Sequence, residues 1–243
     1  RKSSVSESFS KQIRPKSEME ILEQKGKNAV IYELQGSLFF GTASQLFSVL
    51  EHDIKTKKFI ILDLKKVQSL DVTAGHIIEL VRDMINDAGG ILIISRIPIQ
   101  IPSGKDMQKY FDGLGFAKAS QSARVFGDLD DAIEWVEDRL LEEESLDGED
   151  EQAYSLAQFE LFKSKKEETI SSLEERMQKV SFKGGEKIFR AGDGGDELFL
   201  IRKGSVRIAL PICDGQSYHI STFGQGMFFG EIAFLDGASR SAD

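Results

Sequence analysis

The chain has 243 residues, 40% of them hydrophobic and 29% charged, which is the composition of a globular protein able to bury a core. Its formal net charge of −9 excludes nucleic acid as a main partner, because a phosphate backbone is bound by a concentrated basic face. The lone Cys213 excludes an internal disulfide and indicates a reducing compartment, and three scattered histidines show no metal-ligand spacing, so we expect no metal site.

Residues 1–25 form a Ser-rich, basic segment without a sustained apolar period, which predicts a linker. Two interpretations stay open: a solvated terminus, or the cytoplasmic exit from a membrane helix, where basic residues accumulate. No run approaches the roughly 20 apolar residues that span a bilayer, so we expect this piece of chain to be soluble as it stands. Because it begins with Arg1 and ends at Asp243 inside an apparent β motif, we expect it to be part of a longer protein.

Residues 26–141 alternate strand-like and helix-like patterns. Apolar runs predict strands at 29–36, 37–41, 58–64, 90–95 and 125–126. Apolar residues at helical spacing predict helices from about 42, over 73–88, over 105–115, and after Asp128, which would cap the last one. This alternation indicates an α/β domain with helices packed on a mixed sheet.

The α/β domain resembles a STAS domain in the strings ELQGSLFFGTASQL, DVTAGHIIEL and DLDDAIEWVEDRL. That fold is shared by anti-sigma-factor antagonists and by the cytoplasmic tails of sulfate permease (SulP) anion transporters. The likeness to the transporter tails is the closer one and, with the basic lead-in RPKSEM, starts at Pro15 and ends at Leu141. It implies a region at the cytoplasmic face of the inner (plasma) membrane, whose partners are the transmembrane domain of the parent transporter and a second copy in a homodimer.

Thr73, in LDVTAG, stands at the expected start of a helix. In anti-sigma-factor antagonists a serine or threonine at this helix entrance is phosphorylated, and a helix N-terminus favours the added negative charge. Helix capping is the alternative, because Asp71 and Thr73 are both ordinary N-cap residues. This resemblance leaves open a second function, that of a partner-switch protein regulated by phosphorylation at Thr73.

The acidic run EEESLDGEDE, 142–151, predicts a second linker, and the apolar residues over 152–180 predict a helical lead-in of one or two helices. Residues 181–243 hold short β-branched and aromatic runs between closely spaced glycines. We expect hairpins through Lys203-Gly204 and Asp214-Gly215, and an incomplete all-β jelly roll as their product.

This last unit resembles the N-terminal part of a cyclic nucleotide-binding domain, in KGGEKIFRAGDGGDELFLIRKGSVRI followed by GMFFGEIAFLDGASRSA. The resemblance implies cAMP or cGMP as a ligand and makes the second string the phosphate-binding cassette. Gly230 and Glu231 would hold the ribose 2′-hydroxyl, and Arg240 would pair with the cyclic phosphate. Backbone N–H groups and one hydroxyl would complete the phosphate site, at Ile232, Ala233, Phe234 and Ser241.

The alternative is a jelly roll that keeps the shape of the family, in which Arg240 pairs with Glu231 or Asp236 and no nucleotide binds. Two positions depart from the family pattern: Ser239 stands where many members have proline, and Asp243 where many have threonine or serine. An acidic side chain at the latter position would repel a phosphate.

No nucleophile in the sequence stands with a plausible base, so we expect no enzyme activity and no required cofactor. The two resemblances together predict the cytoplasmic regulatory region of a SulP-type anion transporter that senses a cyclic nucleotide.

Overall fold

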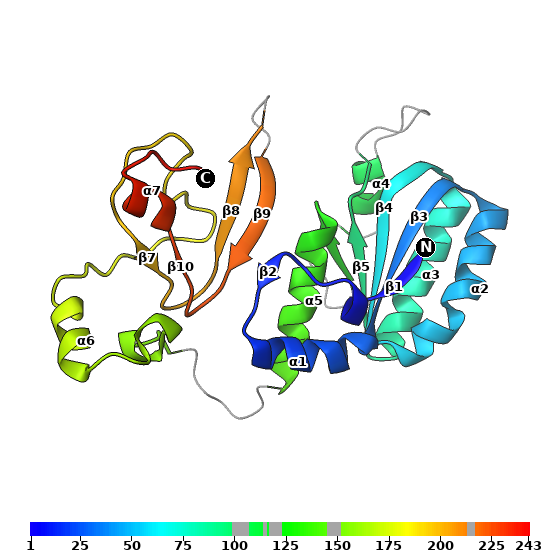
Figure 1. Cartoon of the computed structure of the whole chain (residues 1–243). Helices are drawn as coiled ribbons and strands as arrows, with labels where there is room; N and C mark the ends of the chain where they lie inside the picture. The colour runs from blue at the N-terminus through cyan, green and yellow to red at the C-terminus, as the bar shows by residue number, and fades with distance from the viewer. Residues whose placement is uncertain (99–106, 114–115, 117–122, 145–151, 213–216) are drawn as a thin grey trace. The chain divides into compact units, whose positions relative to one another are not determined.

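The computed structural model describes residues 1–98, 107–113, 116, 123–144, 152–212 and 217–243 (Figure 1). The chain divides into two compact units. The first comprises Arg1–Ser10 and Pro15–Leu146, and the second comprises Lys11–Arg14 and Asp147–Asp243. Among the described helices, none combines the length and the apolar character that a membrane span requires.

The first unit is built on a five-stranded sheet with the order β1-β3-β4-β5-β6. Its strands are β1 (Lys2–Ser4), β3 (Ala29–Leu38), β4 (Phe59–Leu70), β5 (Ile91–Ser95) and β6 (Ala123–Phe126). The β1 strand runs antiparallel to β3, and the other neighbours pair in parallel, so the sheet is mixed as the sequence predicts.

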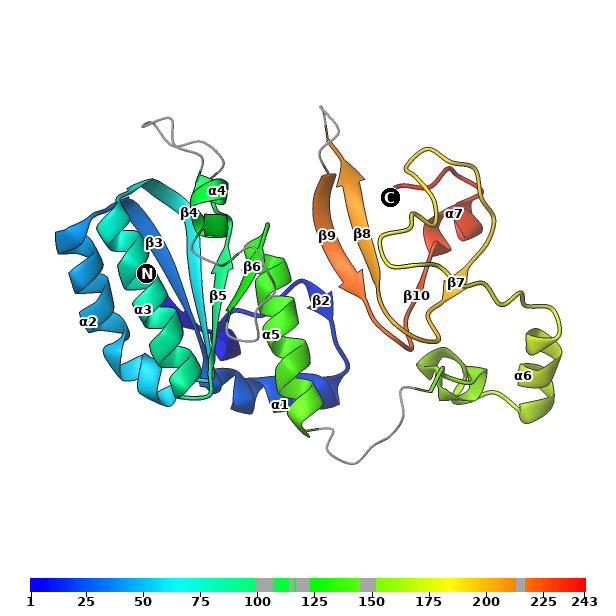
Figure 2. The same cartoon turned by 180° about the vertical axis from the view of Figure 1, so that it is seen from behind.

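Helices cover both faces of this sheet, as Figures 1 and 2 show from opposite sides. The helices of the unit are α1 (Lys16–Lys25), α2 (Phe40–Thr56), α3 (Val72–Asp87), α4 (Met107–Gly113) and α5 (Leu129–Glu144). Short 3-10 helices, η1 (Val5–Glu7) and η2 (Gly26–Asn28), flank α1. The predicted helices of the α/β domain are therefore present.

Two separate cores follow from the pleat of the strands, because successive side chains point to opposite faces. Ile60 and Leu62 of β4 belong to the core that also contains buried residues of α2 and α3. Phe59 and Ile61 of the same strand belong to the core formed with α1 and α5. A continuous apolar run is required where both faces of a strand are covered.

The structure corrects the prediction that residues 1–25 are a linker, since they form β1, η1, β2 (Gln12–Ile13) and α1. Val5 and Leu22 are fully buried and pack in the core beside α5. Two isolated apolar residues among polar ones leave no period in the sequence, although they anchor the segment.

The predicted break at Gly36 is also corrected, because β3 continues through it as one strand. Gly36 has a φ of 86°, which glycine adopts without the penalty that a Cβ would bring. The β3–β4 register shifts between Glu33 and Gln35 and again between Gly36 and Ser37. The glycine therefore marks an irregularity inside the strand rather than its end.

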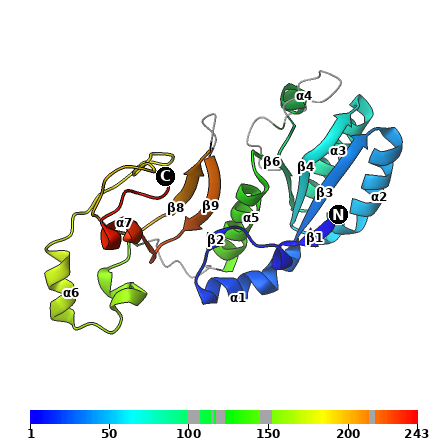
Figure 3. The ribbon, with the colours of Figure 1, turned by 45° about the horizontal axis from the view of Figure 1, so that its top comes forward.

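The second unit contains two small sheets. One has the order β2-β9-β8 (Figure 3), and the other pairs β10 with β7 (Figure 1). Its strands are β2 (Gln12–Ile13), β7 (Phe199–Leu200), β8 (Val206–Pro211), β9 (Ser217–Phe223) and β10 (Phe228–Phe229). The pairing of β8 with β9 confirms the second predicted hairpin, whose turn at Asp214-Gly215 lies outside the described residues. The first predicted hairpin is wrong, because β7 pairs with β10 instead of β8.

The predicted helical lead-in of the second unit is shorter than the sequence suggests. It consists of η3 (Leu156–Gln158), η4 (Glu160–Phe162) and α6 (Glu167–Glu174). Leu156, Phe159 and Phe162 form a small core of their own, and their aromatic rings meet edge to face. The charged stretch SKKEE interrupts the helical lead-in between η4 and α6, so that no single long helix forms, while Ile170 and Leu173 of α6 pack against this core.

Candidate functional site

The predicted cassette forms a strand, a single short helix and an extended end, visible around α7 in Figure 1. Helix α7 (Glu231–Asp236) follows β10 directly. It lies between two glycines in the left-handed conformation, Gly230 with a φ of 85° and Gly237 with a φ of 63°. The short helix predicted for the run IAFL is therefore present, and its two ends depend on glycine.

Gly230 also leaves room for an arginine. A Cβ at this position would lie 2.6 Å from Nη1 of Arg240 and 3.1 Å from the carbonyl oxygen of Glu197. The Gly230 carbonyl oxygen accepts a hydrogen bond of 3.0 Å from that same Nη1. Gly230 is thus required both by its backbone conformation and by the close approach of Arg240.

The guanidinium of Arg240 is buried, with 3% of its side chain exposed. Nη1 donates to the carbonyl oxygens of Gly230 and Glu197, each at 3.0 Å. Nη2 donates to the carboxylate oxygen Oε2 of Glu197 at 2.9 Å. Planar N–H groups in a fork are suited to bind carboxylate or phosphate oxygens, and here the fork meets a carboxylate.

Aromatic rings support the same guanidinium. Its central carbon lies 4.4 Å from the ring centroid of Phe189 and 5.6 Å from that of Phe199. Phe199 stacks on Phe229, with ring centroids 5.0 Å apart and planes inclined by 12°. The rings of this cluster stabilise the guanidinium of Arg240 by cation–π interactions and shield it from water.

The backbone of Arg240 is fixed as well. Its N–H donates to the carbonyl oxygen of Asp193 at 2.8 Å, and its own carbonyl oxygen accepts from the N–H of Gly192 at 2.8 Å. The arginine is therefore positioned by backbone pairing, by two carbonyl groups and by aromatic rings.

An open hollow of about 700 Å³ lies next to this arginine. Two segments line it, with the residues Gly192, Gly194, Gly195, Asp196, Glu197, Gly237, Ala238 and Ser239. Glu197 lines the hollow and also forms an ion pair with Arg240, so it connects the two. A Cβ at Gly195 would lie 2.7 Å from Nη2 and 2.8 Å from Nε of Arg240, so the absence of a side chain lets the Gly195 backbone lie close against this edge of the buried guanidinium.

The predicted binding residues are only partly brought together. Gly230 and Arg240 are in contact with each other. None of the predicted residues belongs to the lining of the hollow, which therefore excludes Gly230, Glu231, Ile232, Ala233, Arg240 and Ser241. In the described part of the chain, the carboxylate of Glu231 has neither a hydrogen bond nor an ion pair. Ala233 is buried, and Ile232 is half exposed.

Two expectations about neighbouring groups are corrected. The N–H of Phe234 is used inside α7, where it donates to the carbonyl oxygen of Gly230 at 3.2 Å, so it cannot also cradle a phosphate. The carboxylate of Asp243 accepts from Lys187 Nζ at 2.5 Å and from the N–H of Ala191 at 2.8 Å. The hydrogen bond from Lys187 lowers the pKa of Asp243, and the cation offsets the negative charge that the sequence suggested would repel a phosphate.

The alternative interpretation of the sequence paired Arg240 with Glu231 or Asp236, whereas in the structure Arg240 pairs with Glu197. Sequence reasoning missed Glu197 because it lies 43 residues away along the chain. The signal that could have found it is the glycine-rich stretch GDGGDE shortly before strand β7, in which the pair Gly194-Gly195 is followed by two carboxylates, Asp196 and Glu197.

The second candidate site is the start of α3. Asp71 is its N-cap and accepts from the N–H of Ala74 at 2.7 Å. Thr73 is exposed, and among the described residues its hydroxyl has no hydrogen-bond partner. Capping is therefore performed by Asp71, which leaves the Thr73 hydroxyl free for another use.

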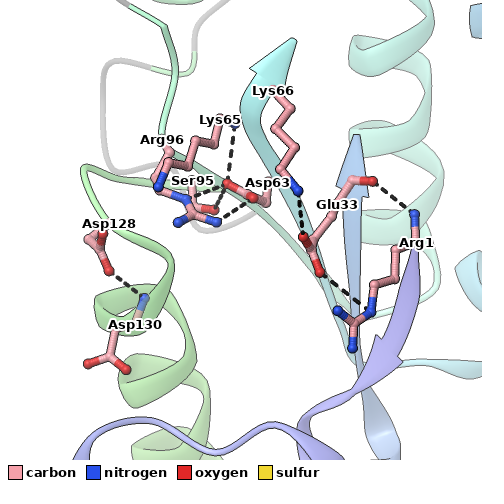
Figure 4. A network of polar contacts seen from close by, with 9 residues as sticks. All are labelled: Arg1, Glu33, Asp63, Lys65, Lys66, Ser95, Arg96, Asp128 and Asp130. Carbon is pink, nitrogen blue, oxygen red and sulfur yellow. Dashed lines mark hydrogen bonds and ion pairs between the residues drawn. The ribbon is translucent and has the colours of Figure 1, made fainter. Parts of the chain in front are cut away.

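Beyond these predicted residues, the first unit contains a polar network that the sequence did not suggest (Figure 4). The buried carboxylate of Asp63, on β4, accepts from Nε of Arg96 at 2.7 Å, from its Nη2 at 2.5 Å and from Oγ of Ser95 at 3.2 Å. The hydrogen bond to Asp63 raises the pKa of Arg96. Arg96 adopts a φ of 55°, a left-handed conformation uncommon outside glycine.

Comparison with protein families agrees with the division of the chain into two compact units. A STAS domain model matches residues 20–132, and a cyclic nucleotide-binding domain model matches residues 179–243. The chain has a STAS domain followed by a cyclic nucleotide-binding domain. This confirms the fold class that the sequence predicted.

The curated relatives differ in how much of the tandem they share. Glutaminase 1 of Bradyrhizobium diazoefficiens is 26% identical over 239 residues, which cover 98% of this chain and 37% of the relative. A CRP-like cAMP-activated global transcriptional regulator of Mycobacterium tuberculosis is 30% identical over 87 residues, 36% of this chain and 39% of the relative. The chain thus spans less than half of the length of these two relatives.

Among solved structures, a sulfate transporter family protein from Wolinella succinogenes matches with 28% sequence identity and a TM-score of 0.39. The match covers 47% of this chain and 88% of that one.

Proposed function

We propose that this region senses a cyclic nucleotide, cAMP or cGMP, through its second domain and thereby regulates the larger protein that carries it. The observation that carries the proposal is the buried guanidinium of Arg240, held by two carbonyl groups and an aromatic cluster beside an open hollow. A phosphate needs such a preorganised donor, and the cassette sequence around it matches the family model.

Glu231 is suited to bind the ribose in this proposal. Glu231 is the first residue of helix α7 and follows Gly230 directly. Its carboxylate has no protein partner in the described part of the chain. A ribose hydroxyl is a donor that an ionised carboxylate accepts well. Ser241 and the backbone N–H groups of Ile232 and Ala233 stay proposed contacts to the ligand.

Titration calorimetry of the chain with cAMP and with cGMP tests the proposal, together with the thermal shift that each ligand produces. A ligand that binds only the folded state raises the melting temperature. With one of the two nucleotides we expect a heat of binding and a rise in melting temperature. Arg240→Ala should abolish the heat of binding and the rise in melting temperature. Absence of heat and of any shift with both nucleotides would contradict the proposal.

For the larger protein, we propose a SulP-type anion transporter, with this region at the cytoplasmic face of the inner membrane and packed beneath the transmembrane domain. The support is the resemblance of ELQGSLFFGTASQL, DVTAGHIIEL and DLDDAIEWVEDRL to the tails of such transporters. A homodimer through the STAS domain stays a prediction, which sedimentation of the purified chain would test.

A specific observation favours a second candidate, an enzyme that carries the same regulatory tandem. Glutaminase 1 aligns with 98% of this chain, through both domains and in the same order. The sequence of the complete gene separates the two. About ten apolar segments of membrane length beside the tandem support the transporter, whereas a stretch similar to the remainder of Glutaminase 1 supports the enzyme.

The exposed hydroxyl of Thr73 favours a third candidate, a partner switch in the STAS domain. In this proposal phosphorylation at Thr73 places a dianion at the start of α3 and changes which partner binds. Incubation with kinases from the source organism, followed by mass spectrometry, tests it, and a threonine that stays unmodified would argue against it.

A further inference from the structure

The orientation of Arg240 does not depend on the carboxylate with which it pairs. Nη1 is held by the backbone carbonyl oxygens of Glu197 and Gly230, and the guanidinium lies over the ring of Phe189. None of these contacts involves the side chain of Glu197. A substitution of that side chain therefore leaves the arginine where it is.

The carboxylate of Glu197 accepts the Nη2 hydrogen bond of Arg240, which a phosphate oxygen is equally suited to accept. It accepts from Nη2 at 2.9 Å, yet 66% of its side chain is exposed, against 3% for Arg240. It lines the hollow together with Gly195, where a Cβ would lie 2.7 Å from Nη2 and 2.8 Å from Nε of Arg240. A carboxylate and a phosphate offer the same kind of oxygen acceptors to this edge.

An exposed glutamate leaves such a position easily. Its carboxylate is stabilised in water when it turns outward, and holding a long side chain in one geometry costs conformational entropy. Only the arginine of this pair is buried, so the carboxylate is the partner that can turn outward into water.

We propose that Glu197 is an internal anion that competes with the cyclic phosphate for Arg240 and so lowers the affinity of the nucleotide site. This inference rests on the proposed function and adds the residue that sets its affinity. A nucleotide has to displace the carboxylate before it gains Nη2, and it meets the repulsion of a like charge while it does so. Removal of the charge makes binding tighter.

Glu197→Gln is the direct test, since it removes the charge and keeps the shape. Calorimetric titration with cAMP and cGMP should give a dissociation constant about fivefold lower than that of the wild type, with a stronger loss of affinity as salt is added, because the guanidinium then faces the anion without a counter-charge. Glu197→Ala should act in the same direction, because the carbonyl group that holds Nη1 belongs to the backbone.

Asp196→Asn is the matched control. It removes the same charge from the same hollow, and the described structure gives Asp196 no hydrogen bond to Arg240. We expect a smaller gain in affinity than for Glu197→Gln. Equal gains in affinity in Asp196→Asn and Glu197→Gln would show that any negative charge in the hollow weakens binding, and would overturn the competition between Glu197 and the phosphate.

The outcomes separate this inference from the function beneath it. Wild-type binding with equal or weaker binding in Glu197→Gln and Glu197→Ala overturns the role of Glu197 and leaves nucleotide sensing in place. Binding that appears only in the Glu197 variants supports the competition and contradicts nucleotide sensing by the wild-type chain. Absence of binding in every variant, with each shown by circular dichroism to be folded, overturns both.

Discussion

Arg96 donates two hydrogen bonds to the carboxylate of Asp63, which is itself buried at the centre of the STAS sheet. An ionised carboxylate is stable in such a place only when it is paired and hydrogen-bonded. The relation between these two residues is therefore a condition for the stability of the first domain.

We predict that Arg96→Met lowers the free energy of unfolding of the STAS domain by about 3 kcal/mol, because it leaves the carboxylate of Asp63 without a counter-charge. Urea denaturation at neutral pH measures the loss. The exposed pair of Lys66 with Glu33, at 3.7 Å, gives the control, and Lys66→Met should change the stability by less than about 1 kcal/mol. Similar losses in the two variants would contradict the importance given to burial.

A second prediction concerns pH and the buried carboxyl of Asp53. Burial raises its pKa, but hydrogen bonds from Lys2 and Tyr32 outweigh burial, so the pKa lies below its ordinary value. A carboxyl with a lowered pKa contributes stability above its unfolded pKa, about 3.9, and loses it as the pH falls through the folded pKa. The stability difference between the wild type and Asp53→Asn should therefore be largest near neutral pH and shrink below about pH 4.

Denaturation curves of both proteins between pH 3 and pH 7 check this. Tyr32 gives a second readout, because burial and the hydrogen bond to Asp53 raise the pKa of its phenol. We expect its absorbance titration to move toward the ordinary value of about 10 in Asp53→Asn. A stability difference that stays constant down to pH 3 would be inconsistent with the role of Asp53.

Gly230 provides a third prediction, with Gly237 as its matched control. Both glycines have a positive φ, but a Cβ at Gly237 meets no atom within 4 Å, whereas one at Gly230 would lie 2.6 Å from Nη1 of Arg240. Gly237→Ala should show only the backbone cost, of about 1 kcal/mol. Gly230→Ala should lose more stability than Gly237→Ala and also lose nucleotide binding; thermal unfolding and calorimetry test the two effects.

The fourth prediction separates capping from signalling at the start of α3. Asp71→Ala should destabilise the domain by about 1 kcal/mol, because it removes the acceptor for the N–H of Ala74. Thr73→Ala should stay within about 0.5 kcal/mol of the wild type, since the exposed hydroxyl caps nothing. Chemical denaturation decides, and a larger loss for Thr73→Ala would assign the threonine to capping.

Much of the first domain could be predicted because its strands are apolar on both faces and its helices carry clear stripes. The run at 58–64 and the stripe at 73–88 correspond to β4 and α3. The folded structure of residues 1–25 could not be predicted. It depends on the packing of Val5 and Leu22 into a core that is formed by residues far along the chain.

The candidate site was predictable in part for a similar reason. Gly230 and Arg240 stand in one local string, and local strings can be recognised. Glu197 and the rings of Phe189 and Phe199 reach Arg240 only through the pairing of β7 with β10. The predicted hairpin joined β7 to the wrong neighbour, so these contacts were missed.

The pleat of the STAS strands limits how the length of this chain can change. From Ala29 to Glu33 the register of β3 against β4 is unbroken, and neighbouring residues supply opposite cores, so one inserted residue would exchange the two sets of side chains. Beyond Glu33 the register already shifts twice without loss of pairing. Insertions and deletions of single residues should therefore be tolerated in the second half of β3, whereas in the first half they should prevent folding.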